Sequence, residues 1–254
     1  MENLEKFRNF MKSSFSTEED EGEYELSDQQ KKLPQPPLQK PYDENDKTID
    51  LPEVTDKILV RSNILDIINQ RESHRKFTDD NLSLEELSFL LWCTQGVKKV
   101  TANNYATLRT VPSGGARHPF ETYLVINHIK GIKKGLYRYL PLHHKLLLIL
   151  EDSTLSSQLS DIACEQTFVG DSAVTFIWSC IPYRGEWRYL DAAHKVMLLD
   201  AGHVCQNLYL ACQAIDCGTC AVGAYDQKLI DKFLGLDGEN EFVVYVAPVG
   251  KVSK

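Results

Sequence analysis

The stretch Arg109-Thr-Val-Pro-Ser-Gly-Gly-Ala-Arg-His-Pro119 directly precedes a predicted strand over residues 121–126. Its paired glycines, flanked by Ser113 and Ala116, remove side chains from a loop, so backbone N–H groups can approach a flat or anionic ligand closely. A tight turn alone would also explain these glycines. The loop has no P-loop lysine and does not open a helix, and the chain contains no G-x-G-x-x-G motif. The pattern therefore disfavours nucleotide triphosphates as ligands.

A second candidate ligand-binding segment is Arg71-Glu-Ser-His-Arg75, which Phe77 follows. Two guanidinium groups and a hydroxyl can converge on one phosphate, because arginine offers a bidentate fork and serine a short donor. Taken alone, the same residues are also compatible with a solvated basic turn.

Composition excludes several classes of partner. The chain has 254 residues, 43% of them hydrophobic, so it can bury a sizeable core. Of its formal charge of −8, residues 1–50 account for −6, with 13 acidic against 7 basic side chains, which leaves a nearly neutral body. That body lacks a basic stripe, and its apolar runs fall far short of the roughly 20 residues of a membrane-spanning helix. We therefore expect a cytoplasmic protein with no nucleic-acid and no membrane partner.

Seven cysteines are scattered along the chain without regular spacing, which favours reduced thiols over a disulfide framework. Cys217-Gly-Thr-Cys220 forms a C-x-x-C, but a zinc or redox role would need a second ligand pair or a thioredoxin-like context. We interpret these cysteines as packed side chains and predict no metal site.

The N-terminal fifth of the chain differs in composition from the remainder. Residues 16–50 are acidic and proline-rich, which predicts an arm or linker. Residues 1–11 place apolar side chains at helical spacing, which predicts a short amphipathic helix that docks elsewhere. We therefore divide the chain into an N-terminal arm over residues 1–50 and a domain over residues 51–254.

The body alternates helical and strand patterns, which predicts an α+β fold. The predicted helices begin after Ser62 or Asn63, after the capping box at Ser83, and after Asp226. The longest helix covers residues 192–215 and is apolar on most faces, so it is either the central core helix or a dimer-interface helix. Strands are predicted over residues 121–126, 136–139, 145–150, 173–179 and 242–247.

Taken in order, these segments resemble SagB-type dehydrogenases of the nitroreductase-like superfamily. The resemblance runs from about residue 50 to residue 252. It is carried by Arg71-x-Ser-x-Arg-x-Phe77, the helix from Leu82 to Gly96, Pro112-Ser-Gly-Gly-Ala-Arg-His-Pro119 with Glu121, Gly135-Leu-Tyr-Arg-Tyr139, and Asp200-Ala-Gly-His-Val-Cys-Gln-Asn-Leu208.

The resemblance implies an interlocked homodimer with two FMN sites at its interface, built on a central mixed or antiparallel sheet flanked by helices. It implies that Arg71, Ser73 and Arg75 hold the FMN phosphate and ribityl chain, with Lys251 reaching the phosphate. The isoalloxazine ring would lie against a loop from the partner subunit and near backbone N–H groups by its N5 atom. The loop residues are Pro112, Ser113, Gly114, Gly115 and Ala116, and the N–H groups are those of Gly223 and Ala224.

One departure from the family concerns Glu186-Trp-Arg-Tyr189. Members that oxidise azolines resemble one another in a Lys-Tyr pair at this place, where a side chain assists proton removal. Arg188 cannot lose its proton at ordinary pH, so it is a poor base and a good anchor for a carboxylate or carbonyl. Tyr189 remains a candidate proton donor, and we predict Arg188 and Tyr189 as the catalytic residues.

Four histidines are given structural roles. His194 and His203 are interpreted as hydrogen-bonded helix residues, and His143-His144 as a solvent-facing turn.

The sequence thus predicts an FMN-dependent oxidoreductase that transfers hydride through flavin N5, with the direction of transfer open. In the reductive alternative, NAD(P)H loads the flavin, which reduces a nitroaromatic, a quinone or an activated alkene. In the oxidative alternative, the protein dehydrogenates a thiazoline or oxazoline in a peptide. A third alternative is a flavin-binding scaffold subunit without turnover, whose acidic arm is the interaction element.

Overall fold

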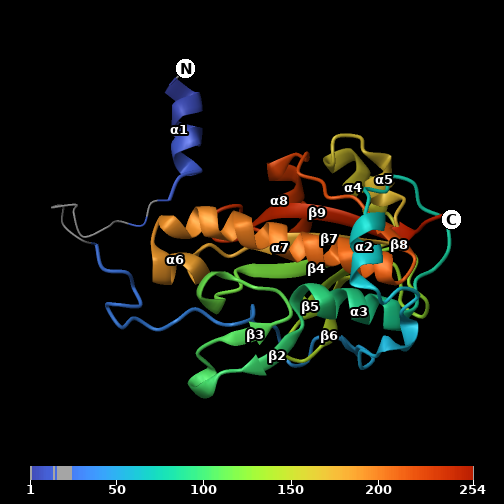
Figure 1. Cartoon of the computed structure of the whole chain (residues 1–254), viewed down its shortest axis with the longest axis horizontal. Coiled ribbons are helices and arrows are strands. Elements are labelled where there is room, and N and C mark those ends of the chain that lie inside the picture. The colour runs from blue at the N-terminus through green and yellow to red at the C-terminus, as the bar shows by residue number, and fades with distance from the viewer. Residues whose placement is uncertain (1, 14, 16–24, 254) are drawn as a thin grey trace.

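The computed structural model describes residues 2–13, 15 and 25–253. Within them the chain forms an α+β fold whose seven-stranded sheet has the order β1-β6-β5-β4-β7-β9-β8 (Figure 1). Every neighbouring pair in this sheet is antiparallel, which decides between the mixed and antiparallel sheets that were expected. The strands are β1 (Thr48–Asp50), β4 (Phe120–Ile126), β5 (Gly135–Leu140), β6 (Lys145–Leu150), β7 (Val174–Cys180), β8 (Cys217–Thr219) and β9 (Phe242–Lys251).

Helices cover both faces of this sheet, and a separate hairpin of β2 (Val97–Val100) and β3 (Thr107–Arg109) lies beside it. The α-helices are α1 (Glu2–Phe10), α2 (Ile64–Gln70), α3 (Leu84–Gln95), α4 (Leu155–Ile162), α5 (Thr167–Gly170), α6 (Tyr183–Tyr189), α7 (Ala192–Ala214) and α8 (Gln227–Leu234). Short 3-10 turns are η1 (Asp56–Ile58), η2 (Ala102–Asn104) and η3 (Gly114–Ala116).

Strand β4 shows why the sheet is central, because all seven of its residues are buried. Successive side chains of a strand point to opposite faces, so β4 contributes to two cores. Phe120 and Leu124 pack with α3 and α7 on one face, whereas Tyr123 and Val125 pack with α4 and α8 on the other. Figure 1 shows α7 crossing the sheet with α2 beside its C-terminal half.

The predicted helix caps are confirmed. Asn63 accepts hydrogen bonds from the backbone of Leu65 and Asp66, which selects Asn63 over Ser62 as the cap of α2. Ser83 and Glu86 form the reciprocal capping box of α3, and Asp226 caps α8. The 23-residue α7 matches the longest predicted helix.

Two local predictions were wrong. Strand β9 does not end before Pro248 but continues to Lys251. Proline is tolerated there because the pairing of β8 with β9 begins only at Val249, so Pro248 has no β8 partner that needs its N–H. His144 is not solvent-facing either. Its Nε2 is hydrogen-bonded to Ser88 Oγ at 2.7 Å, and its Nδ1 is hydrogen-bonded to Tyr139 Oη at 2.8 Å.

Residues 25–41, here called the strap, lie along the body although their composition is that of a linker. Arg109 donates to the carbonyl of Leu38 at 3.2 Å, and Arg138 donates to the carbonyl of Pro41 at 2.8 Å. Trp187 Nε1 donates to the carbonyl of Leu33 at 3.2 Å. Buried side chains of the body therefore bind these three carbonyl groups of the strap. Residues 16–24 of the predicted arm lie outside the described residues.

Helix α1 confirms the predicted N-terminal helix, and its apolar side chains at Leu4 and Phe7 are exposed. Among the described residues, no helix has both the length and the apolar character needed to span a membrane.

Candidate active site

The Pro112–Ala116 segment, here called the glycine loop, contains backbone conformations that residues other than glycine adopt only under strain. Gly115 has φ +60°, inside the left-handed region, and it lies at the centre of η3. The loop is held by Asp200 of α7, which accepts from Ser113 Oγ at 2.6 Å and from the backbone N–H of Gly114 at 3.0 Å. Asp200 is buried, and burial raises the pKa of its carboxyl, while the Ser113 and Gly114 hydrogen bonds oppose the rise.

Arg188 and Tyr189, at the end of α6, lie directly against this loop. A Cβ atom added at Gly115 would come within 2.5 Å of Tyr189 Oη and 3.1 Å of Arg188 Cδ. A Cβ atom at Gly114 would come within 2.4 Å of Val196 on α7. The glycines are thus required by close packing, and the structure brings together two groups of predicted site residues that are 73 positions apart in the chain, from 115 to 188.

The segment that follows α2 runs beside β8 and the end of β9, where His74 N donates to the carbonyl of Thr219 at 3.0 Å. Ser73 Oγ is 2.9 Å from Tyr209 Oη of α7, and the Arg71 guanidinium lies 5.3 Å from the centroid of the same tyrosine ring. Arg75 lies 6.0 Å from the ring centroid of Phe168. Within the described part of the chain, neither Arg71 nor Arg75 belongs to an ion pair.

Tyr209 also connects this segment to the loop after β8. Its hydroxyl accepts from the backbone N–H of Ala221 at 2.8 Å. Farther along, Gly223 and Ala224 are exposed, and neither of their N–H groups donates to another described residue. A Cβ atom at Gly223 would meet nothing within 4 Å. These two backbone donors are therefore accessible to a ligand.

The Lys251 side chain is hydrogen-bonded to two groups of its own chain. Its Nζ donates to Glu86 Oε1 of α3 and, at 3.1 Å, to the carbonyl of Ile215. Burial opposes its charge, but the hydrogen bond from Lys251 to Glu86 leaves the lysine's pKa raised above its ordinary value. These contacts do not support the phosphate role expected for Lys251.

Helix α7 links the two clusters of site residues. Asp200 holds the glycine loop and Tyr209 holds Ser73, and at 1.5 Å per residue these two side chains are about 13 Å apart along the helix axis. Between them, Gly202, His203 and Gln206 are exposed. Nine residues make two and a half turns, so Asp200 and Tyr209 project from opposite sides of α7 and the two clusters lie on different sides of the helix.

Buried charges support the loop from beneath. Glu121 and Arg184 form an ion pair with side chains only 2% and 3% exposed. Burial alone would raise the pKa of Glu121, but the charges of Arg184 and Arg138 hold that pKa below its ordinary value. Burial, together with Arg109, lowers the pKa of His118 to about 3, so its imidazole is neutral at physiological pH.

Cys217, Cys220 and His194 fit the roles predicted for them, whereas Cys164 is exposed and the His203 side chain makes no hydrogen bond to another described residue. Cys217 and Cys220 are buried, and burial raises the pKa of Cys217 to about 12, which makes its thiol a poor nucleophile. His194 Nε2 lies 2.7 Å from Glu186 Oε1, and His203 is exposed with Nδ1 3.9 Å from Asp200.

Sequence reasoning missed two residues that organise the site, Asp200 and Tyr209. An acidic residue inside an otherwise apolar helix was the available signal for Asp200. Tyr209 carried no signal, because its two partners, Ser73 and Ala221, come from distant segments.

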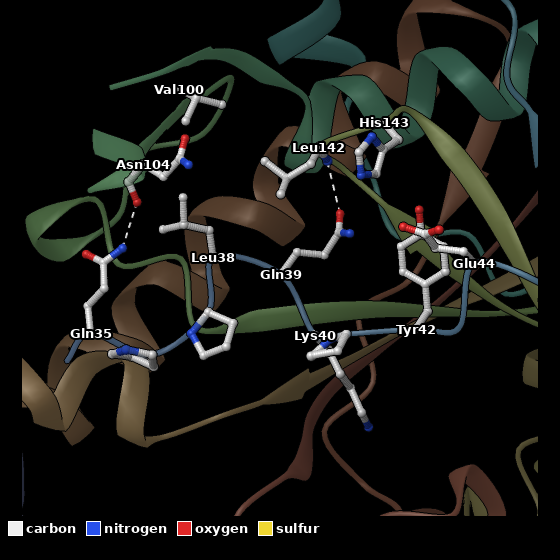
Figure 2. A pocket seen from close by; sticks show the side chains of 13 residues that line it. Gln35, Leu38, Gln39, Lys40, Tyr42, Glu44, Val100, Asn104, Leu142 and His143 are labelled. Atoms are coloured by element: carbon white, nitrogen blue, oxygen red, sulfur yellow. Dashed lines mark hydrogen bonds between the residues drawn. The ribbon is translucent and has the colours of Figure 1, made fainter. Parts of the chain in front are cut away.

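A pocket lies elsewhere, along the strap. Its volume is about 680 Å³, and it is bounded by the strap, the β2–β3 hairpin and the turn at residues 142–143 (Figure 2). Figure 2 shows Gln39 receiving the N–H of Leu142 and Gln35 donating to the carbonyl of Asn104 across this pocket. It includes none of the predicted site residues.

The chain belongs to the nitroreductase family, whose model matches residues 68–251. It is 30% identical over 186 residues to MJ1384 of Methanocaldococcus jannaschii, a relative named as a nitroreductase, and the match covers 73% of this chain and 89% of the relative. It is 31% identical over 166 residues to the trifolitoxin-processing protein TfxB of Rhizobium leguminosarum bv. trifolii, covering 62% of this chain and only 44% of TfxB.

Solved structures share the fold. A nitroreductase from Ralstonia eutropha matches with a TM-score of 0.67 and 23% identity, over 87% of this chain and 95% of the other. The NADPH:FMN oxidoreductase of Vibrio harveyi, complexed with NAD⁺, matches with a TM-score of 0.54 and 17% identity, over 76% and 70% of the two chains. Enzymes of the nitroreductase family are flavin oxidoreductases that typically bind FMN.

Proposed function

We propose that this chain is an FMN-dependent oxidoreductase that exchanges electrons with NAD(P)H and a small organic substrate. The observation that carries the proposal is the donor set around Ser73, where two arginines without an ionic partner among the described residues flank a hydroxyl. Family membership supplies the type of cofactor.

The residues fit FMN in charge and in shape. Arg71 and Arg75 offer guanidinium forks to a phosphate dianion, and Ser73 and Tyr209 offer hydroxyl donors. The space beside Gly223 is open, and the N–H groups of Gly223 and Ala224 have no partner among the described residues. A flat ring could therefore approach this backbone closely. Lys251 is left out of the proposed set because Glu86 neutralises it.

When bound, FMN supplies hydride transfer at N5, so the protein has to bind, orient and desolvate the reactants. We propose that the Pro112–Ala116 loop supports the flavin ring and that Gly223 and Ala224 direct N–H groups toward N5. Arg188 anchors the polar group of a substrate, and Tyr189 donates or holds a proton at its hydroxyl. Both side chains are half-buried and touch the loop, which supports this assignment.

Peptide azoline dehydrogenation is the second candidate function. The similarity to TfxB, which is named for processing trifolitoxin, favours it. Arg188 counts against it, because a guanidinium cannot serve as the base that removes a proton from the azoline.

We further propose that the protein works as a homodimer. Leu198 and Leu199 of α7 are 51% and 56% exposed, and α2 beside it exposes Ile64, Leu65 and Ile68. Exposed apolar side chains on two packed helices are typical of an interaction site. A second copy on this surface would let the glycine loop of one subunit and the Ser73 cluster of the other share a flavin. We propose residues 51–254 as the flavin-binding part of the chain, to whose sheet β1 (Thr48–Asp50) adds an edge strand.

The phosphate assignment is tested by equilibrium binding of FMN, followed by flavin fluorescence. Arg71→Ala should weaken binding by about 1.5–3 kcal/mol, the contribution of a charge-assisted hydrogen bond. Lys76→Ala is the matched control, because it removes a cation from the same exposed segment without changing the Arg-x-Ser-x-Arg pattern. Equal FMN affinity in the wild type and Arg71→Ala would refute the assignment.

The dimer is tested separately by sedimentation velocity. Leu199→Glu places a charge in the proposed interface, and we expect it to produce monomers with reduced FMN affinity. A wild-type protein that sediments as a monomer when loaded with FMN would contradict the proposal.

A further inference from the structure

A cluster of aromatic and cationic side chains joins the strap to the glycine loop. Its centre is Tyr105, a residue that follows η2 and is 38% exposed. Tyr105 Oη accepts one hydrogen bond from Gln29 Nε2 of the strap at 2.7 Å and another from Arg188 Nη1 at 3.1 Å. One hydroxyl therefore connects the strap to a proposed substrate-side residue.

Arg117 fixes the distance between this tyrosine and the loop. Its guanidinium lies 4.7 Å from the ring centroid of Tyr105 and 5.4 Å from that of Trp187, so it is held between two aromatic side chains. Its Nε donates to the carbonyl of Gly115 at 3.1 Å, and its Nη2 donates to the carbonyl of Tyr105 at 3.0 Å. The phenol of Tyr105 is thus held in a defined position relative to Gly115.

The charge on this side of the loop is positive. In the described ranges, neither Arg117 nor Arg188 belongs to an ion pair. A guanidinium has five N–H donors, and Arg188 uses one of them on Tyr105. The ring of Tyr189 lies 5.2 Å from the Arg188 guanidinium and adds an apolar wall. Such a surface suits a planar ligand with a carboxylate, which accepts two parallel N–H bonds from one guanidinium.

We propose that Tyr105, fixed by Gln29 of the strap, is a positioning residue that directs Arg188 toward the carboxylate of an aromatic substrate. The inference rests on the proposed function, because it places that carboxylate beside the loop proposed to support the flavin ring. The strap is then a wall of the substrate site. Neutral aromatic compounds enter the same site but lack the charge-assisted hydrogen bonds.

The test uses the full-length protein loaded with FMN and the probes benzoate and benzamide, which differ in charge but scarcely in shape. Binding is measured by calorimetry and by the change in visible flavin absorption. In the wild type, we expect benzoate to bind at least about tenfold more tightly than benzamide, and Arg188→Gln should abolish that preference. Tyr105→Phe should weaken benzoate about fivefold while leaving benzamide and FMN binding unchanged.

Tyr183→Phe is the matched control. It removes another hydroxyl between α6 and the strap, the one that donates to Asp28 at 3.0 Å, without touching Arg188. We expect it to bind both probes like the wild type.

Several results would overturn the inference. Equal binding of benzoate and benzamide by the FMN-loaded wild type would refute carboxylate recognition while leaving the proposed function intact. An equal loss of both probes in Tyr105→Phe would show a structural role only, and an unchanged benzoate affinity would show no role. A protein that binds no FMN would refute the proposed function and this inference with it.

Discussion

Gly115→Ala tests the close packing of the glycine loop against Tyr189. The substitution places a side chain at φ +60°, which costs about 1–2 kcal/mol for an L-residue in the left-handed region. Its Cβ atom would also lie 2.5 Å from Tyr189 Oη, so the tyrosine must move. Overpacking of this kind costs about 1–3 kcal/mol, which brings the expected destabilisation to about 2–5 kcal/mol.

Gly131→Ala separates these two contributions. Gly131 has φ +83°, but a Cβ atom there would meet nothing within 4 Å, so only the backbone cost of about 1–2 kcal/mol remains. Urea unfolding, followed by tryptophan fluorescence, gives the free energy of unfolding of both variants. Tyr189→Phe removes the closest clashing atom, so the double variant Gly115→Ala with Tyr189→Phe should recover part of the loss.

A Gly115→Ala variant that is no less stable than Gly131→Ala would contradict close packing of the loop against Tyr189. A double variant whose loss of stability is the simple sum of the two single losses would contradict the contact as well, because substitutions of residues in contact are not additive.

Three further predictions concern the site and its support. Tyr189→Phe should leave FMN affinity unchanged and slow turnover, and equal steady-state rates would remove Tyr189 from the mechanism. Glu121→Gln leaves Arg184 buried without its ionic partner, so urea unfolding at pH 7 should show a loss of about 3–5 kcal/mol, and a loss below 1 kcal/mol would contradict the pairing. Because the folded protein holds the pKa of His118 at about 3, below the ordinary value of about 6.5, its contribution to stability is complete above about pH 6.5 and is lost as the pH falls toward 3. His118→Asn should therefore flatten the pH dependence of urea stability across this window, and an unchanged slope would argue against a buried neutral imidazole.

The elements that could be predicted from sequence are those with local signals. The capping box at Ser83 and the long apolar pattern between Asp191 and Gly218 specified α3 and α7, because caps and periodicity act within a few residues. Helix α6 was not predicted, because no side chain caps its N-terminus, whereas the equally short α2 begins at the Asn63 cap. The short β8 was missed because three residues are too few to show a period.

The strap could not be anticipated from its composition. Its order depends on Arg109 and Arg138, which lie 71 and 97 positions from the carbonyls they bind. The contact of Lys251 with Glu86 could not be anticipated either. The place of Lys251 after the last strand suggested a phosphate ligand, but the fold brings Glu86 of α3 to it, and no local pattern reports that contact.

Among the site residues, those in compact motifs were the most predictable. The glycine loop and the Arg71–Arg75 segment carry their chemistry in a few consecutive residues. Arg188 was noticed only as a departure from a related pattern, and its partner Tyr105 was not noticed at all. Such pairs arise from tertiary packing, which a single sequence does not encode in its spacing.

The central claim is that this chain binds FMN and passes electrons through it. We would test it by titrating the purified, FMN-loaded protein with NADH and then NADPH under anaerobic conditions while following the oxidised flavin absorption band. The account predicts rapid bleaching by one of the two nucleotides and recovery of the band when a nitroaromatic or quinone is added. A flavin that is tightly bound but stays oxidised with both nucleotides would contradict the reductase function and favour the peptide dehydrogenase or the scaffold.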